Sequence, residues 1–283
     1  MEYTIAHQTT YYYADSVDES YTVIHLQPRS DPHQFCTKYT IDIKPQARIN
    51  SYADRFGNDV QHFAILPPHD SLSITTRSNV VTMLEREPLP PVDATRTALA
   101  EDSKVERFYD FLHESPYVQF LDADKSVLEE FGAPGDEIGA WCSHVMHHIN
   151  ATFSYDTDAT TVRTTVEEAI ARRAGVCQDF AHVAIACTRA MGLAARYVSG
   201  YLLTKPPPGK ERLIGADASH AWFAVWFPSY GWVDFDPTND VLPNGEHITT
   251  AWGRDFADVS PIHGIVTGGS AHEIEVAVDV IPS

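Results

Sequence analysis

The stretch RRAGVCQDFAHVAIACTRAMGLAARYVSGYL, from Arg172 to Leu202, carries the most informative structural pattern of this chain. Its pattern predicts a long apolar helix that starts just after Gly175 and ends at Gly192, followed by a strand. The helix is rich in small and apolar residues, as a central covered helix should be: Val183, Ala184, Ala186, Cys187, Ala190 and Met191. The stretch therefore predicts a core in which strands pack on one buried helix.

Cys177 falls in the first turn of that predicted helix. The free N–H groups and the positive end of the helix dipole favour a thiolate over a thiol there, and the same N–H groups can stabilise an oxyanion. Cys187 lies in the helix interior without these advantages, so we interpret it as a packing residue. A cysteine is also a common small core residue. Position alone therefore suggests a nucleophile at Cys177 without deciding the matter.

Two motifs further along the chain could supply partners for Cys177. DASHAWFAVWF predicts an aromatic strand with His220 near its start, and GWVDFDPTND predicts a strand that ends at Asp236. The short connection at 228–231 makes the two strands a hairpin, across which His220 and Asp236 could face each other. Each residue alone has an ordinary structural explanation. Together with a thiol they supply the nucleophile, the base and the orienting acceptor of thiol catalysis.

The rest of the chain predicts two domains around a linker. Residues 1–86 form an all-β domain of sandwich or barrel type, because short β-branched and aromatic runs alternate with turn-prone groups. Residues 87–99 form a proline-rich linker. Residues 100–283 form an α+β domain in which helical patterns precede alternating strands. We expect the last strand, HEIEVAVDVIP at 272–282, to return to the sheet of this second domain.

Composition excludes several classes of partner. The formal net charge of −19 repels nucleic acid and anionic lipid, so we expect neither nucleic acid nor a membrane as a partner. The N-terminus has no secretory pattern, and no run approaches the roughly 18 apolar residues that span a bilayer. The four cysteines form no CxxC pair. These features predict a cytoplasmic location with reduced thiols.

No motif predicts a cofactor or a metal. Walker, dinucleotide-binding and GxSxG patterns are absent from the sequence. His144 and His148 are one helical turn apart in WCSHVMHHIN, a spacing that can chelate a metal, but the carboxylate of an HExxH motif is missing. We therefore interpret this segment as a solvated or internally satisfied helix face, and expect no cofactor and no metal.

The segments GVCQDFAHV, SHAWFAVWFPSYGWVDFDPTND, RYVSGYL and HQTTYYY…HLQPR together resemble the transglutaminase-like cysteine-enzyme superfamily, particularly bacterial members with an N-terminal β domain. The resemblance implies a papain-like core, with a cysteine-bearing helix packed on an antiparallel sheet. It implies Cys177 as nucleophile, His220 as base and acid, and Asp236 as orienting residue. Asp234 is a rival, because residues two apart share a strand face, but Asp236 matches the DPT motif of the family.

Two further residues are candidates for supporting roles. The resemblance suggests that Tyr155 lines the site, where its hydroxyl could donate to the oxyanion, although an ordinary half-buried tyrosine fits as well. Gln178 could offer its backbone N–H to the same oxyanion.

The predicted function is a thiol-dependent enzyme that acts on amide bonds of a protein or peptide. Resolution of the thioester by water would give a peptidase or amidase, and resolution by an amine would give a transglutaminase. The same triad serves both, and we favour hydrolysis because water is always available and no residue marks an amine site. A catalytically silent binding module on the same fold is the alternative from a different class.

Overall fold

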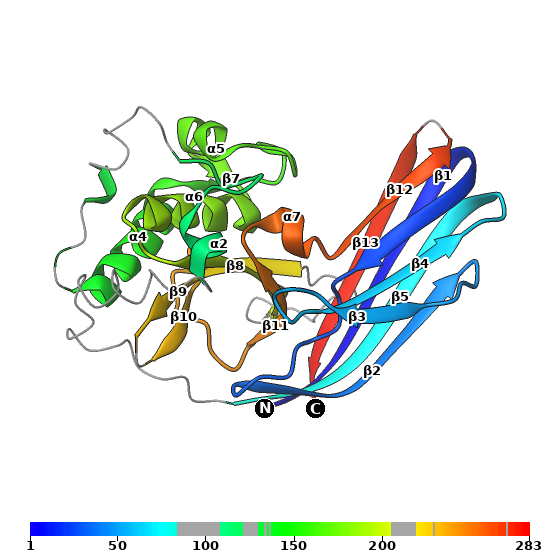
Figure 1. The fold of residues 1–283 in the computed structure, drawn as a ribbon, viewed down its shortest axis with the longest axis horizontal. Helices are drawn as coiled ribbons and strands as arrows, with labels where there is room; N and C mark the ends of the chain where they lie inside the picture. The colour runs from blue at the N-terminus through cyan, green and yellow to red at the C-terminus, as the bar shows by residue number, and fades with distance from the viewer. Residues whose placement is uncertain are drawn as a thin grey trace, which may run out of the picture.

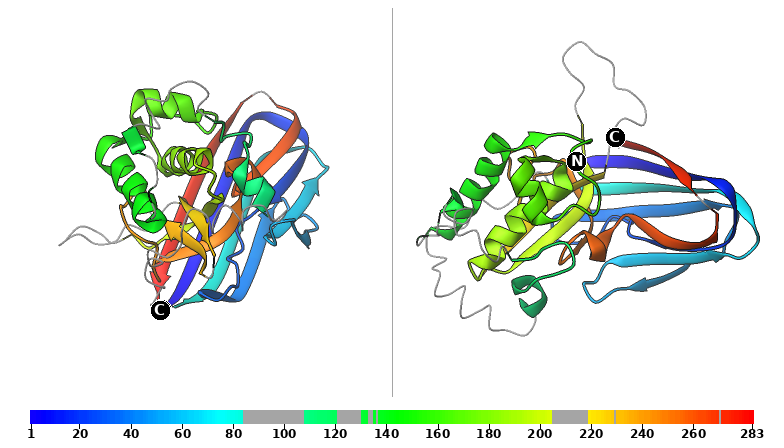
Figure 2. Two further views of the ribbon diagram at one scale, coloured as in Figure 1. Left: turned by 60° about the vertical axis from the view of Figure 1, so that its left-hand side comes forward. Right: turned by 90° about the horizontal axis from the view of Figure 1, so that it is seen from above.

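The computed structural model contains two antiparallel sheets and a group of helices (Figure 1, Figure 2). It describes residues 1–83, 108–120, 130–132, 135, 137–204, 219–228, 230–269 and 271–283. The linker predicted at 87–99 lies outside these residues. Among the described helices, none combines the length and the apolar character needed to cross a membrane.

The larger sheet has seven strands in the order β2-β5-β1-β4-β3, with β12 and β13 also paired with β1. Their bounds are β1 Glu2–Ile24, β2 Gln34–Lys44, β3 Asn50–Ala53, β4 Asp59–Ile65, β5 His69–Thr82, β12 Ile262–Gly268 and β13 His272–Pro282. Short strands were expected in this part of the chain, but β1 runs unbroken from Glu2 to Ile24. Val17 and Ser20 within this range are almost fully buried, so the strand continues there.

The C-terminal strand β13 belongs to this larger sheet, and the expectation that it joins the second sheet is wrong. It pairs with β1 from Tyr3 opposite Pro282 to Tyr13 opposite His272. Val278 and Val280 are fully buried in the same apolar core as Tyr3. Alternation along a strand identifies the buried face but does not identify the neighbouring strand. The two ends of the chain therefore lie side by side (Figure 1).

The smaller sheet has the order β10-β9-β8-β11. The apolar helix predicted after Gly175 packs on this sheet. The strands of the sheet are β8 Ala195–Leu202, β9 Ser219–Phe227, β10 Gly231–Phe235 and β11 His247–Gly253. Helix α6, Cys177–Ala190, packs on it, and every residue from Gln178 to Arg189 is buried. This confirms the predicted α+β core, in which the helix that begins with Cys177 lies against an antiparallel sheet.

Further elements surround α6 and complete the core. They are α2 Tyr109–Leu112, α4 Ile138–Thr152, α5 Val166–Arg172, α7 Phe256–Val259 and the parallel pair β6 Ser154–Tyr155 and β7 Ala174–Gly175. The Arg189 guanidinium inside α6 donates to the carbonyl oxygens of His113, Ala195 and Arg254. These acceptors offset the cost of burying its charge.

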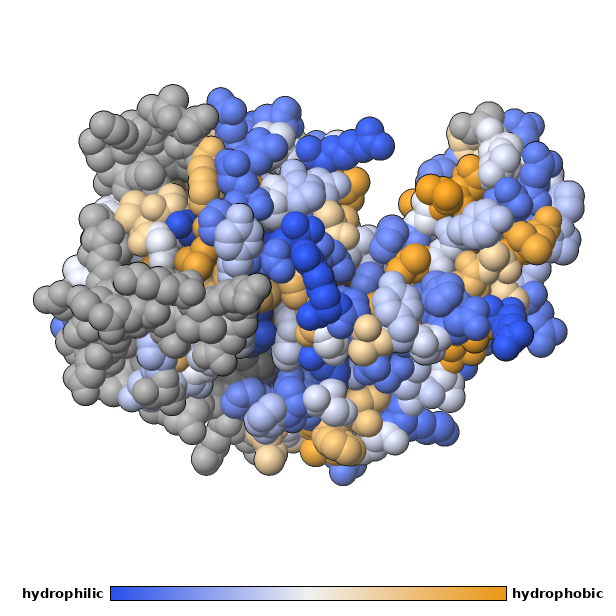
Figure 3. All heavy atoms as spheres, viewed as in Figure 1, coloured by the Kyte–Doolittle hydropathy of each residue, from blue (hydrophilic) through white to orange (hydrophobic). Residues whose placement is uncertain are grey.

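The two sheets are joined by side chains as well as by packing. The amide of Gln34 donates to the carbonyl of Thr249 on β11 and accepts from its N–H, both at 2.7 Å. Nδ1 of His7 lies 2.9 Å from the hydroxyl of Tyr201 on β8. At one end of the larger sheet, β1, β12 and β13 stand apart from the helices. The surface is hollowed between these strand ends and the helices (Figure 3). The larger sheet therefore braces β8 and β11.

Gly200 of β8 lies opposite His220 of β9 and has no room for a side chain. A Cβ there would come within 2.1 Å of the Ile248 carbonyl oxygen and 2.7 Å of the Trp222 ring. We expect Gly200→Ala to lower the free energy of unfolding in urea by about 2 to 3 kcal/mol. The control Gly135→Ala, where a Cβ meets nothing within 4 Å, should change it by less than about 1 kcal/mol. Equal losses in both variants would contradict this packing argument.

Candidate active site

A capped helix start holds Cys177 as the first residue of α6. The carboxylate of Asp179 accepts hydrogen bonds from the N–H of Val176 at 2.8 Å and from the hydroxyl of Thr160 at 2.7 Å. It occupies the space beside Gly175, where a Cβ would lie only 2.5 Å from Oδ2 of Asp179. Cys177 is consequently fixed, half-buried, at the end of the helix that presents free N–H groups.

His220 and Asp236 meet at the open end of the β9–β10 hairpin. Phe223 pairs with Phe235, so Asp236 follows directly at the end of β10. Nε2 of His220 lies 2.8 Å from Oδ2 of Asp236. Cys177 is near enough to His220 to contribute to raising the pKa of that ring. The structure thus brings together three residues that come from three different elements.

The pKa of His220 depends on two opposing effects, burial and the neighbouring groups Asp236 and Cys177. Burial alone would lower this pKa, because it penalises the imidazolium. The hydrogen bond to Asp236 and the neighbouring Cys177, together with their negative charges, outweigh burial and raise the pKa to about 10. His220 is therefore protonated at neutral pH in the folded protein. Because Nε2 is bound to Asp236, Nδ1 is the nitrogen that is left for Cys177.

Five donors surround the carboxylate of Asp236, which is 0% exposed. Oδ2 accepts from Nε2 of His220, from Nε2 of His247 at 3.0 Å and from the side-chain amide of Asn239 at 2.7 Å. Oδ1 accepts from the N–H groups of Thr238 and Asn239. Burial would raise the pKa of Asp236, but these hydrogen bonds hold it well below its usual range. We call Asp236 and the four residues that supply these donors the Asp236 cluster.

His220, Asp236 and His247 are also compact enough to be considered as metal ligands. Within the described residues they are the one group whose ligand atoms all lie within 4.8 Å of one another. A carboxylate has about four acceptor positions, and the five donors already use them. An ion would have to displace several of these hydrogen bonds, so the donor set fits a hydrogen-bonded network better than a metal site.

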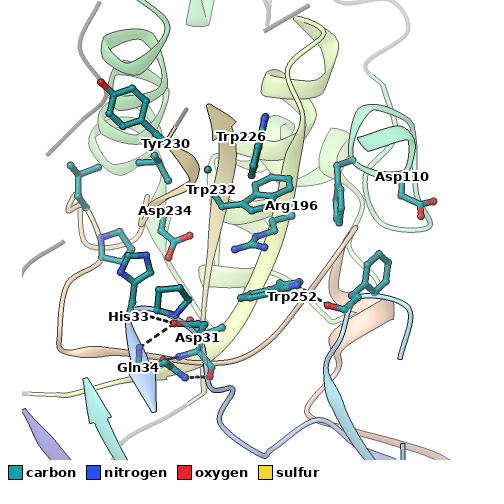
Figure 4. Close-up of a pocket in the computed structure, with 18 of the residues that line it drawn as sticks. Asp31, His33, Gln34, Asp110, Arg196, Trp226, Tyr230, Trp232, Asp234 and Trp252 are labelled. Atoms are coloured by element: carbon teal, nitrogen blue, oxygen red, sulfur yellow. Dashed lines mark hydrogen bonds between the residues drawn. The ribbon is translucent and has the colours of Figure 1, made fainter. Parts of the chain in front are cut away.

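Asp234, the alternative candidate for the orienting residue, does not face His220 or Cys177. It lies in a cavity of about 600 Å³ on the sheet face that turns away from α6, and none of Cys177, His220 and Asp236 lines this cavity (Figure 4). Other walls are aromatic, and the guanidinium of Arg196 lies 4.4 and 3.8 Å from the ring centroids of Trp232 and Trp252. Asp234 lies on β10, whereas Asp236 lies beyond the end of that strand. The two carboxylates therefore do not share a strand face.

Tyr155 and Gln178 both lie next to Cys177. Tyr155 pairs with Gly175 across β6 and β7, and its side chain is more than half exposed. Burial and then the charge of Cys177 raise the pKa of Tyr155. The amide of Gln178 donates to the carbonyl of Val162 at 3.3 Å. Its side chain is therefore engaged elsewhere, and its backbone N–H remains the group to consider.

The histidines of α4 do not converge on a common point. Nδ1 of His147 lies 2.8 Å from Asp240, and Nε2 of His148 lies 2.7 Å from Glu130. The rings of His144 and His148 are 5.9 Å apart between centroids. Each of the two bonded histidines has its own carboxylate partner, which agrees with the interpretation of this segment as an internally satisfied helix face.

Sequence reasoning missed His247 and Asn239. The side chain of His247 contacts Asp236 from outside the three motifs, whereas Asn239 lies within GWVDFDPTND but was not singled out there. One signal was present, because GEHITTAW carries a histidine at the start of a β-branched run, much as DASHAWF does at His220. Nothing local, however, indicated that β11 would lie two strands away from β9 with this histidine at the same end.

Comparison with known proteins supports this architecture. Residues 3–81 match the family described as the bacterial transglutaminase-like N-terminal region, and residues 125–237 match the transglutaminase-like superfamily. An uncharacterized protein of Mycobacterium tuberculosis is 39% identical over 295 residues, which cover 99% of this chain and 92% of the relative. The crystal structure of a candidate cysteine protease from Cytophaga hutchinsonii aligns with a TM-score of 0.79 at 21% identity, covering 100% of this chain and 91% of that one.

A shorter similarity concerns an enzyme. The protein-glutamine gamma-glutamyltransferase of Pseudomonas aeruginosa is 38% identical over 72 residues, which are 25% of this chain and 11% of that protein. The matches cover both the N-terminal sheet and the cysteine-bearing core. The chain belongs to the transglutaminase-like superfamily.

The raised pKa of His220 predicts a specific pH dependence of stability. A group that binds its proton more tightly when folded stabilises the fold below its unfolded pKa, here 6.5, and loses that contribution as the pH rises to about 10. We expect the advantage of the wild type over His220→Gln in free energy of unfolding to shrink steadily across this interval. Urea denaturation at several pH values checks this. An advantage that stays constant or grows would contradict the proposed charge state.

Proposed function

We propose that the chain is a thiol enzyme that cleaves or transfers acyl groups at amide bonds, with Cys177 as nucleophile, His220 as acid and base, and Asp236 as orienting residue. The observation that carries the proposal is the position of His220, which bonds to Asp236 through Nε2 and whose pKa is also raised by the neighbouring Cys177. A protonated imidazole beside a sulfur stabilises its thiolate form. A nucleophile, a proton carrier and an acceptor are thus arranged in series.

The reaction begins when the sulfur of Cys177 attacks the amide carbonyl carbon and a C–S bond forms. The electron pair of the carbonyl moves to oxygen, and the N–H groups at the start of α6 are placed to stabilise this oxyanion. The backbone N–H of Gln178 and the hydroxyl of Tyr155 are the proposed further donors.

Collapse of this intermediate breaks the C–N bond and leaves a thioester on Cys177. His220 donates its proton from Nδ1 to the departing amine, while Asp236 keeps the ring oriented through Nε2. Water then attacks the thioester, His220 accepts a proton from it, and a carboxylic acid leaves as the thiolate re-forms. We favour this hydrolysis, because water needs no binding site of its own.

Acyl transfer is the second candidate, and the similarity to the Pseudomonas aeruginosa glutamyltransferase supports it. In this reaction a primary amine replaces water, loses a proton to His220 and forms a new amide. Incubation with a glutamine-containing peptide, with and without a primary amine, separates the two reactions by product mass. We expect the hydrolysed product to dominate in both incubations; predominant amine adducts would replace hydrolysis by transfer.

Reactivity of the thiols tests whether the site is catalytically competent. We expect iodoacetamide at pH 6 to 7 to label Cys177 faster than any other cysteine. Cys36 is the matched control, since it has the same intermediate exposure and burial raises its pKa. Cys142 and Cys187 are fully buried, and burial also raises the pKa of both.

His220→Ala should slow the labelling of Cys177 at least about tenfold, because the charge that favours the thiolate is lost, and should leave Cys36 unchanged. Mass spectrometry of the labelled peptides measures all four rates at once. Equal, slow labelling of Cys177 and Cys36 in the wild type would favour the silent binding module.

The site of action is a further part of the proposal. All four cysteines are free, which supports a reducing compartment, and we extend the proposal to a cytoplasmic location. Fractionation of cells followed by immunodetection tests this, and recovery outside the cytoplasm would overturn it.

A further inference from the structure

His247 occupies a place in the Asp236 cluster that none of the sequence motifs assigns. It is the first residue of β11 and is 3% exposed. Its Nε2 lies 3.0 Å from Oδ2 of Asp236, the same oxygen that His220 approaches at 2.8 Å. The two imidazole centroids are 6.0 Å apart, so one carboxylate oxygen joins two histidines directly.

The surroundings of His247 determine its protonation state. Its Nδ1 accepts a hydrogen bond from the N–H of Asn244 at 3.4 Å, which requires an unprotonated nitrogen. The proton of a neutral ring is then on Nε2, in position to be donated to Asp236. Asp236 and His220 are ionisable groups beside His247, and the Trp222 ring lies 5.3 Å away. A second positive ring beside His220 would be repelled.

We propose that His247 is a positioning residue, a neutral imidazole whose Nε2–H holds Oδ2 of Asp236 where that oxygen orients His220 toward Cys177. The inference rests on the proposed function of the triad. Asp236 lies just beyond β10 and bridges to Val241 in a short turn, whose N–H groups bond to Oδ1 and whose Asn239 side chain bonds to Oδ2. His247 reaches it from the opposite edge strand of the sheet. The two edges of the sheet thereby fix the carboxylate from both sides.

Alkylation of Cys177 at pH 6 tests this without a known substrate. His247→Leu removes the donor, and we expect the rate to fall about tenfold, which corresponds to about 1.4 kcal/mol. His247→Gln retains an N–H at nearly the position of Nε2, and we expect it to recover the rate to within about threefold of the wild type. His25→Leu is the matched control, because His25 is also buried but bonds to the Ser260 carbonyl and not to Asp236.

A double-mutant cycle separates positioning from general packing. If His247 acts through Asp236, then His247→Leu should slow labelling by less than about twofold in an Asp236→Asn background. An equal slowing in both backgrounds, or a His247→Gln variant as slow as His247→Leu, would overturn the inference. The proposed function itself fails only if wild-type Cys177 reacts no faster than Cys36, so the two failures are distinguishable.

A measurement on the unmodified protein covers the case in which the variants do not fold. Nitrogen-15 NMR of histidine-labelled protein reports the protonation of each ring, and the signal of His247 can be assigned through its chain neighbours Glu246 and Ile248. We expect a neutral ring protonated on Nε2 throughout pH 6 to 8. A ring protonated on Nδ1, or one that becomes an imidazolium near pH 6.5, would refute the positioning role.

Discussion

The buried carboxylate of Asp236 is the constraint on which the arrangement of this site depends. An ionised carboxylate with no exposure to water costs several kcal/mol unless donors surround it. Here the donors come from β9, from β11 and from the turn that follows β10. All three segments must therefore be in register for the fold to be stable. The same hydrogen bonds hold His220 beside Cys177, so the requirement for stability and the geometry of the site coincide.

The N-terminal sheet contributes to this constraint from a distance. Gln34 binds both backbone groups of Thr249, two residues after His247, and His7 contacts Tyr201, next to the residue opposite His220. The pairing of β12 and β13 with β1 closes the chain back onto this sheet. A β domain whose sequence contains no catalytic motif thus braces the strands that carry the site.

Much of the fold was predictable because its signals are local. The helix that begins at Cys177 and the alternating strands β8, β9 and β10 were all recognisable from periodicity. Periodicity failed in two kinds of place. The pattern around Val17 is too irregular to show that β1 is continuous, and β13 alternates cleanly yet reveals nothing about its partner strand. A pairing across nearly the whole chain depends on the total apolar area buried, which no short window contains.

Local patterns were sufficient to predict the position of Cys177 at a helix start, the histidine and aspartate motifs, and the superfamily, because each depends on neighbouring residues. The folded chain was needed to show that Asp236 faces His220 while Asp234 faces a separate cavity, and that His247 completes the cluster. These outcomes depend on where strands end and which strands lie at each edge of the sheet. Such relations arise from packing between segments far apart in the chain, and so no local pattern could encode them.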